Sequence, residues 1–169
     1  MKSFEVIGGS KLNGEIVPQG AKNEGLQVIC AVLLTSEEVV ISNIPDIVDV
    51  RLLIEILADM GVEVKQVSED TYSFKAAHTI IDRLYDPDFH RKANRLRGSV
   101  MIAGPLLSRF KRSVLPRPGG DKIGRRRMDT HIIGFEKLGA VAEYDENEGY
   151  FRLSARSLTG ADILLDEPS

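Results

Sequence analysis

The sequence has 169 residues, of which 43% are hydrophobic and 28% are charged, and its formal net charge is −3. This length allows one domain or two small ones with a hydrophobic core, and no apolar run approaches the roughly 18 residues of a membrane-spanning helix. The single cysteine, Cys30, excludes a disulfide framework, and the first residues lack the apolar stretch of a signal peptide, so we expect a cytoplasmic protein.

The first segment of the chain combines short strands with a glycine turn. Residues 3–17 predict two strands around a Gly/Asn turn, and residues 24–34 have the apolar spacing of a helix. Lys22 and Asn23 therefore lie at a helix N-terminus, where unpaired N–H groups favour an anion. Two other interpretations stay open, in which Asn23 caps the helix and Lys22 is an ordinary surface charge.

The next segment predicts a strand, a helix and a hairpin. Residues 39–45 are β-branched and end at a proline, and residues 49–60 place apolar side chains on one helical face. Gly61 is typical of a helix C-terminus. Residues 62–67 and 71–74 then alternate with period two on either side of a short polar turn, which indicates two paired strands.

The same order of elements then recurs. Residues 99–107 match the end of the first helix, Pro118 lies 73 positions after Pro45, and Gly139 lies 78 positions after Gly61. The second copy thus has five extra residues, which fall in a loop at 119–127. A repeat of this length predicts an α/β fold in which similar units bury their faces against one another. Residues 76–92 read as a connector between the copies.

The loop at 117–129 contains three glycines, a central Asp121 and five Lys or Arg side chains. Such a loop brings N–H groups and guanidinium groups close to an anion, although a solvated basic loop would have the same composition. Residues 91–127 carry twelve Lys or Arg against one acid, which indicates either a phosphorylated small molecule or nucleic acid as the ligand. Only Phe110 could stack on bases there, so the small molecule is favoured.

Two further groups of residues carry less information. His78, His90 and His131 lie too far apart in the sequence to predict a metal site, and we interpret them as surface or helix residues. Residues 158–169 begin like another copy of the strand near Gly14 and then end. The chain is therefore expected to be cut within a third unit.

Four blocks resemble a known family. They are Gly-Ala-Lys-Asn at 20–23, residues 96–107, residues 118–127 and residues 164–169. In this order and spacing they are similar to successive blocks of the UDP-N-acetylglucosamine enolpyruvyl transferases, over nearly the whole chain. The resemblance implies an incomplete inverse α/β barrel of βαβαββ units. Its parts would be strands at 1–21 that belong to a second domain, units at 22–92 and 93–157, and the start of a third unit at 158–169.

The resemblance also implies a reaction without a cofactor or metal. The family transfers the enolpyruvyl group of phosphoenolpyruvate to the 3-hydroxyl of UDP-N-acetylglucosamine, the first committed step of peptidoglycan synthesis. The resemblance implies that Lys22 binds phosphoenolpyruvate and that Asn23 contacts the substrate. The other substrate-binding positions implied are Arg97, Arg126, Arg127, Met128, Asp129, Thr130, Glu167, Pro168 and Ser169. The main catalytic base would lie in the missing part of the chain, so this chain alone is expected to lack turnover.

Two positions depart from the family pattern. Asp121 stands where many members have a cysteine that is associated with protonating phosphoenolpyruvate and with product release, and we expect it to be the proton donor if its pKa is raised. Met101 stands where an aromatic residue is frequent. Two alternatives remain: an enolpyruvyl transferase that acts on shikimate phosphate, and a module that binds nucleic acid without catalysis.

Overall fold

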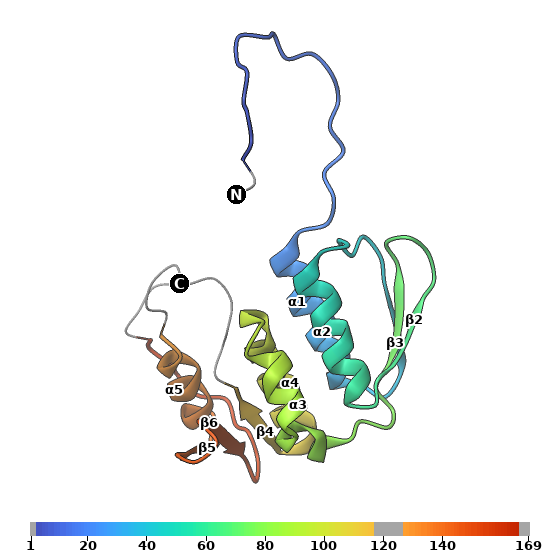
Figure 1. Cartoon of the computed structure of the whole chain (residues 1–169). Helices are drawn as coiled ribbons and strands as arrows, with labels where there is room; N and C mark the ends of the chain where they lie inside the picture. The colour runs from blue at the N-terminus through green and yellow to red at the C-terminus, as the bar shows by residue number, and fades with distance from the viewer. Residues whose placement is uncertain (1–2, 117–126, 166–169) are drawn as a thin grey trace.

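The computed structural model describes residues 3–116 and 127–165. They form two units of the same design (Figure 1), each with a three-stranded antiparallel sheet. The first unit contains α1 (Lys22–Ala31), the 3₁₀ helix η1 (Val32–Leu34), β1 (Glu38–Ile41), α2 (Val48–Asp59), β2 (Glu63–Gln66) and β3 (Tyr72–Lys75). The second contains the 3₁₀ helix η3 (Arg97–Ile102), α4 (Ala103–Phe110), β4 (Arg112–Leu115), α5 (Asp129–Lys137), β5 (Val141–Asp145) and β6 (Tyr150–Ser154).

The two sheets have equivalent strand orders, which confirms the predicted repeat. In the first sheet β3 lies between β1 and β2, and in the second β6 lies between β4 and β5. Lys75 of β3 is opposite both Glu38 of β1 and Glu63 of β2, so opposite charges face each other across the strands. The predicted hairpin is confirmed, since β2 and β3 pair in antiparallel register.

Glycines end the corresponding helices of the two units. Gly61 follows α2 with φ of 88°, and Gly139 follows α5 with φ of 97°. A Cβ at Gly61 would also lie 2.7 Å from the carbonyl oxygen of His78. The helix end predicted at Gly61 is therefore confirmed, and at this position both the backbone conformation and the space require glycine.

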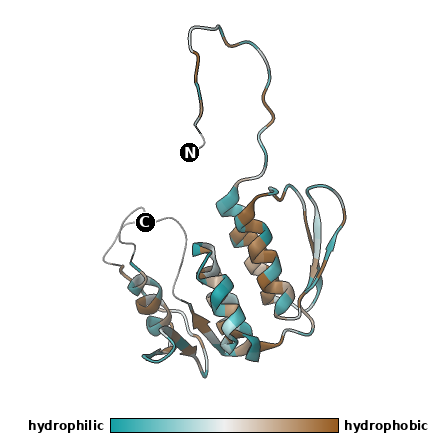
Figure 2. Cartoon of the chain, in the orientation of Figure 1, coloured by the Kyte–Doolittle hydropathy of each residue, from teal (hydrophilic) through white to brown (hydrophobic). Residues whose placement is uncertain are grey.

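The main hydrophobic core runs through both units. It joins Leu53, Leu57 and Phe74 of the first unit to Leu106 and Val114 of the second, and all five are fully buried. A smaller cluster lies under α5. Figure 2 shows the apolar character of α2, which packs against α1. No helix in the described ranges is long and apolar enough to cross a bilayer.

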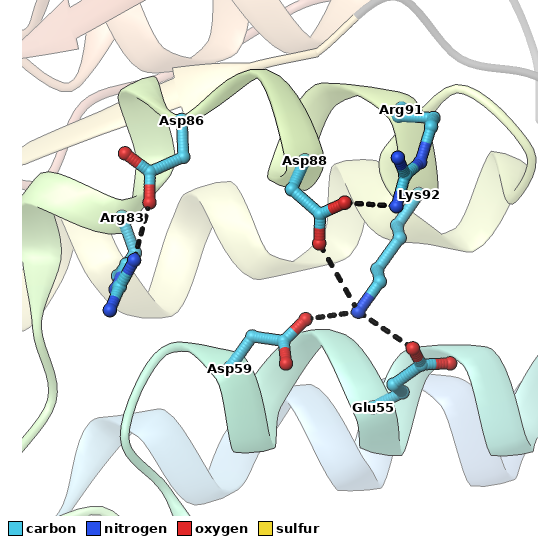
Figure 3. A network of polar contacts seen from close by, with 7 residues as sticks. All are labelled: Glu55, Asp59, Arg83, Asp86, Asp88, Arg91 and Lys92. Atoms are coloured by element: carbon cyan, nitrogen blue, oxygen red, sulfur yellow. Dashed lines mark hydrogen bonds and ion pairs between the residues drawn. The ribbon is translucent and has the colours of Figure 1, made fainter.

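The predicted connector at 76–92 is more ordered than expected. It contains a 3₁₀ helix, η2 (Ile81–Tyr85), and α3 (Pro87–Ala93), which begins after Asp86 with a proline in its first turn. Lys92 of α3 lies among three carboxylates (Figure 3): Nζ is 2.6 Å from Oε1 of Glu55, also pairs with Asp59, and is 3.4 Å from Oδ2 of Asp88. Hydrogen bonds to Asp59 and Glu55 raise the pKa of Lys92 and tie α3 to α2.

The structure differs from three expectations about local structure. Residues 3–20 form no strand in the described chain but an extended segment that leads away from the body (Figure 1), with Phe4 96% and Leu12 99% exposed. A strand needs a neighbour to complete its hydrogen bonds, and this segment has none among the described residues. Residues 158–165 likewise form no strand. The helix predicted at 99–107 is divided, with η3 first and α4 after it.

Candidate functional site

A cavity of about 320 Å³ lies between α1 and η3. Its apolar wall includes Leu26 and Met101, and its polar lining comprises Lys22, Asn23, Gln27, Asp49, Arg97 and His131. These side chains come from four helices of both units. The fold therefore brings Lys22, Asn23 and Arg97 together, as the resemblance implies.

The first turn of α1 forms one edge of the cavity. Its N-cap residue is Ala21, and no side chain in the described chain caps the helix. Asn23 lies inside the helix at its second residue, so the interpretation of Asn23 as the cap is wrong. The first-turn N–H groups and the helix dipole consequently favour an anion at the same edge as the Lys22 ammonium group.

Asp49 faces Lys22 across the mouth of the cavity. Its Oδ2 lies 3.0 Å from Nζ of Lys22, and the two side chains are 38% and 51% exposed. Asp49 occupies the first turn of α2, where a carboxylate is favoured by the helix dipole. Asp49 was not predicted as a site residue, because a carboxylate at this position is typical of an ordinary helix start.

Close packing of η3 on α1 places Arg97 in the cavity. A Cβ at Gly98 would lie 2.9 Å from Cδ1 of Leu26, so a larger residue would require the end of the Leu26 side chain to shift. Arg97 is the first residue of η3 and lines the cavity together with Lys22. Two cations from different units thus line one hollow, an arrangement that suits a doubly charged phosphate.

His131 completes the lining on the side of α5. Partial burial, and secondly the charge of Arg97, lower its pKa, so the imidazole is neutral near pH 7. His131 lies on a helix and is exposed, as predicted, but its place in the cavity was missed. Among residues 3–116 and 127–165, no three His, Cys, Asp or Glu side chains lie together as a metal site.

A second hollow of about 340 Å³ adjoins the first at His131. It is lined by Thr130, Phe135 and Leu138 of the α5 region and by Ile163 and Leu165 from the end of the described chain. Thr130 is therefore near the candidate site. Phe135, Leu138, Ile163 and Leu165 form an apolar wall in this hollow, beside the hydroxyl group of Thr130.

The remaining predicted residues either lie away from both hollows or fall outside the described part of the chain. Arg127 and Asp129 line neither hollow but pair with each other, with Nε of Arg127 2.9 Å from both carboxylate oxygens. This hydrogen bond from Arg127 lowers the pKa of Asp129. Met128 packs against the smaller core cluster. Asp121, Arg126, Glu167, Pro168 and Ser169 lie outside the described residues.

Four of the Lys and Arg side chains in the described part of the basic zone pair with groups of the protein itself. Arg91 pairs with Asp88, Lys92 with Glu55 and Asp59, and Arg112 with Asp82. Arg109 donates hydrogen bonds to the carbonyl oxygens of Leu33, Thr35 and Ala76. These contacts reduce the cationic surface available to a nucleic acid and leave the cavity as the best-defined anion site.

Comparisons with known proteins agree with this geometry. Residues 6–169 match the family model described as EPSP synthase (3-phosphoshikimate 1-carboxyvinyltransferase). Over all 169 residues the chain is 53% identical to a UDP-N-acetylglucosamine 1-carboxyvinyltransferase of Bacteroides fragilis and 50% identical to one of Porphyromonas gingivalis. The chain spans 39% of the length of each of these two relatives.

Solved structures show the same fold. The enolpyruvyl transferase NikO from Streptomyces tendae is similar with a TM-score of 0.66 and 25% identity, over 90% of this chain and 32% of that one. The EPSP synthase of Acinetobacter baumannii is similar in fold, with a TM-score of 0.62 and 15% identity over 92% of this chain and 35% of that one. The expected fold class, an incomplete α/β domain of the enolpyruvyl transferase type, is confirmed.

Proposed function

Because this chain belongs to the EPSP synthase family of enolpyruvyl transferases, we propose that it supplies one side of an active site that uses phosphoenolpyruvate and UDP-N-acetylglucosamine. The reaction joins the enolpyruvyl group to the 3-hydroxyl of the sugar and releases phosphate. It would begin peptidoglycan synthesis. Both substrates are charged metabolites, so the proposal puts the reaction in the cytoplasm. The observation that carries the proposal is the cavity in which Lys22, Asn23 and Arg97 meet.

The cavity supports a role in holding the phosphate of phosphoenolpyruvate. The Lys22 ammonium group, the Arg97 guanidinium group and the first-turn N–H groups of α1 are all donors at one edge. Preorganised donors of this kind are each worth about 3 kcal/mol when they face charge that develops in a transition state. Asp49 would exchange its partner Lys22 for solvent as the phosphate enters.

The chemistry needs a proton at the methylene carbon. As the sugar hydroxyl adds to the central carbon of phosphoenolpyruvate, the methylene carbon gains a proton and the hydroxyl loses one. The resulting tetrahedral intermediate then loses phosphate, and a proton leaves the new methyl group. We assign the first proton to Asp121, because the family resemblance places it at the position associated with protonating phosphoenolpyruvate. The nearby arginines favour the carboxylate, so burial or bound phosphate must raise its pKa.

The second hollow supports a role in holding the uridine nucleotide. Phe135, Ile163 and Leu165 offer apolar surface for a base, and Thr130 offers a hydroxyl group beside it. Arg126 and the segment 167–169 would add polar contacts to the sugar nucleotide. His131 adjoins both hollows, so the two substrates would meet beside a neutral imidazole.

Shikimate 3-phosphate is a second candidate acceptor, because the matching family model carries the name of EPSP synthase. Relatives that are 50–53% identical over the whole chain are named for UDP-N-acetylglucosamine instead. The test is phosphate release from phosphoenolpyruvate by the natural gene product that contains this chain, with each acceptor in turn. Turnover with UDP-N-acetylglucosamine alone supports the proposal. Turnover with shikimate 3-phosphate alone would overturn it.

A further inference from the structure

Gly20, two residues before the start of α1, is in close contact with the loop that follows β1. A Cβ at Gly20 would lie 1.9 Å from the carbonyl oxygen of Asn43 and 3.1 Å from Cδ of Pro45. Real Cβ atoms are never found so close to an oxygen, so any other residue must displace one side of this contact. Glycine is required here because of space.

The loop side of the contact is firmly held. The N–H of Ile44 donates a hydrogen bond of 2.8 Å to the carbonyl oxygen of Asp70, and the Ile44 side chain is 3% exposed in the main core. Asn43 adopts φ of 58°, a left-handed conformation that asparagine tolerates better than most residues. Displacing this loop would disturb the core.

The other side of the contact is less firmly held by the described body. Residues 3–19 are exposed, and a Cβ at Gly8 or Gly14 would meet nothing within 4 Å. Figure 1 shows this segment leaving the body at the start of α1. A side chain at position 20 would therefore shift residues 20–22 and the first turn of α1. These are the residues that carry the Lys22 ammonium group and the N–H groups at the cavity edge.

We propose that Gly20 is a positioning residue, which seats the start of α1 against Asn43 and so sets Lys22 and Asn23 for the phosphate of phosphoenolpyruvate. The proposal rests on the proposed function of the cavity. It assigns Gly20 no contact with substrate. Since a misplacement of about 1 Å can reduce a rate or affinity by up to about a hundredfold, a single methyl group has a measurable effect.

The test compares Gly20→Ala with two matched substitutions in the natural gene product that contains this chain. Gly25→Ala lies in the first turn of α1, where a Cβ would meet Cδ of Pro45 at an ordinary 3.5 Å, and Gly8→Ala lies in open space. We expect Gly20→Ala to raise KM for phosphoenolpyruvate at least about tenfold, and to weaken its affinity by calorimetry equally. Both control variants should stay within about twofold of the wild type.

The double variant Gly20→Ala/Asn43→Gly should recover part of the affinity for phosphoenolpyruvate that Gly20→Ala loses. Glycine keeps the left-handed conformation at position 43 at no steric cost and allows the carbonyl group to turn away. Part of the lost affinity should therefore return, although the double variant contains one more change. Equal melting temperatures of the single and the double variant would show that the recovery is not an effect of stability.

Each outcome decides a different claim. An unchanged KM and affinity in Gly20→Ala would overturn the positioning role. Failure of Gly20→Ala to fold would also overturn it, because the displacement would then have reached the core rather than α1. If the wild type neither binds phosphoenolpyruvate nor turns it over, the proposed function fails. If the wild type binds and Gly20→Ala binds equally well, only the further inference fails.

Discussion

Nζ of Lys22 lies 3.0 Å from Oδ2 of Asp49, so the first turns of α1 and α2 are joined at the mouth of the cavity. Both side chains are partly exposed, and an exposed pair contributes about 0–1 kcal/mol to stability. We predict that Asp49→Asn lowers the free energy of unfolding by less than about 1 kcal/mol in urea titrations. A loss of several kcal/mol would show that the pair holds the fold rather than serving the site.

Arg109 joins the two units through backbone groups. Its Nη1 lies 3.2, 2.8 and 2.9 Å from the carbonyl oxygens of Leu33, Thr35 and Ala76. Arg109→Met should cost about 2–4 kcal/mol, because three carbonyl groups lose a charged donor. Urea unfolding measures this loss, with Arg95→Met at an exposed position as the control. Equal stability of the two variants would contradict the role of Arg109.

Cys30 is the only cysteine of the sequence and is 1% exposed. Burial raises its pKa to about 12, so the thiolate needed for alkylation is scarce. By the resemblance, Asp121 stands at the position of the cysteine frequent in the family, so we predict that an epoxide inhibitor that alkylates that cysteine leaves the native protein unmodified. Intact mass spectrometry should show an adduct only after denaturation. Time-dependent inactivation with an adduct at Asp121 would refute this prediction.

We predict that protonation of His90 lowers the stability of the fold in acid. Its ring stacks on Tyr150 at 4.2 Å, and Nε2 is buried without a hydrogen-bond partner in the described chain. Burial lowers the pKa of His90, while the charge of Glu148 and a hydrogen bond with the Leu84 carbonyl oppose that effect. The unfolded chain therefore takes up the proton first, at about pH 6.5, and stability falls as the pH drops below that value.

Replacing the imidazole tests this pH dependence. His90→Phe keeps an aromatic ring against Tyr150 and removes the titrating group. The difference in melting temperature between pH 7.5 and pH 5 should be smaller in His90→Phe than in the wild type. An identical pH dependence in both proteins would show that other groups, such as His131, account for the effect.

The repeat was predictable because glycines and prolines mark its boundaries. Gly61 and Gly139 end equivalent helices through positive φ, and the alternation of residues 62–74 gives the hairpin directly. Local patterns of this kind depend on the backbone conformations that each residue type prefers, so they can be recognised in a single sequence. The prediction that Lys22 and Arg97 lie in one site came from the family resemblance, since no local pattern links residues so far apart in the sequence.

Other features depend on contacts that a single sequence does not display. The close approach of η3 to α1 places Gly98 against the end of the Leu26 side chain, and the contact of Gly20 with Asn43 joins two separate loops. His131 reaches the cavity because α5 packs on the smaller core cluster, which includes Val100 of η3. Residues 3–20 have a strand-like pattern, but pairing needs a neighbouring strand, which the described chain does not offer them.

The central claim is that the cavity between α1 and η3 binds the phosphate of phosphoenolpyruvate. The most direct test is the affinity of the natural gene product for phosphoenolpyruvate in Lys22→Met, measured by calorimetry, with the exposed Lys11→Met as the matched control. The account predicts a loss of about a hundredfold or more in Lys22→Met, and a change within about twofold in Lys11→Met. Equal affinity of Lys22→Met and the wild type would contradict the account.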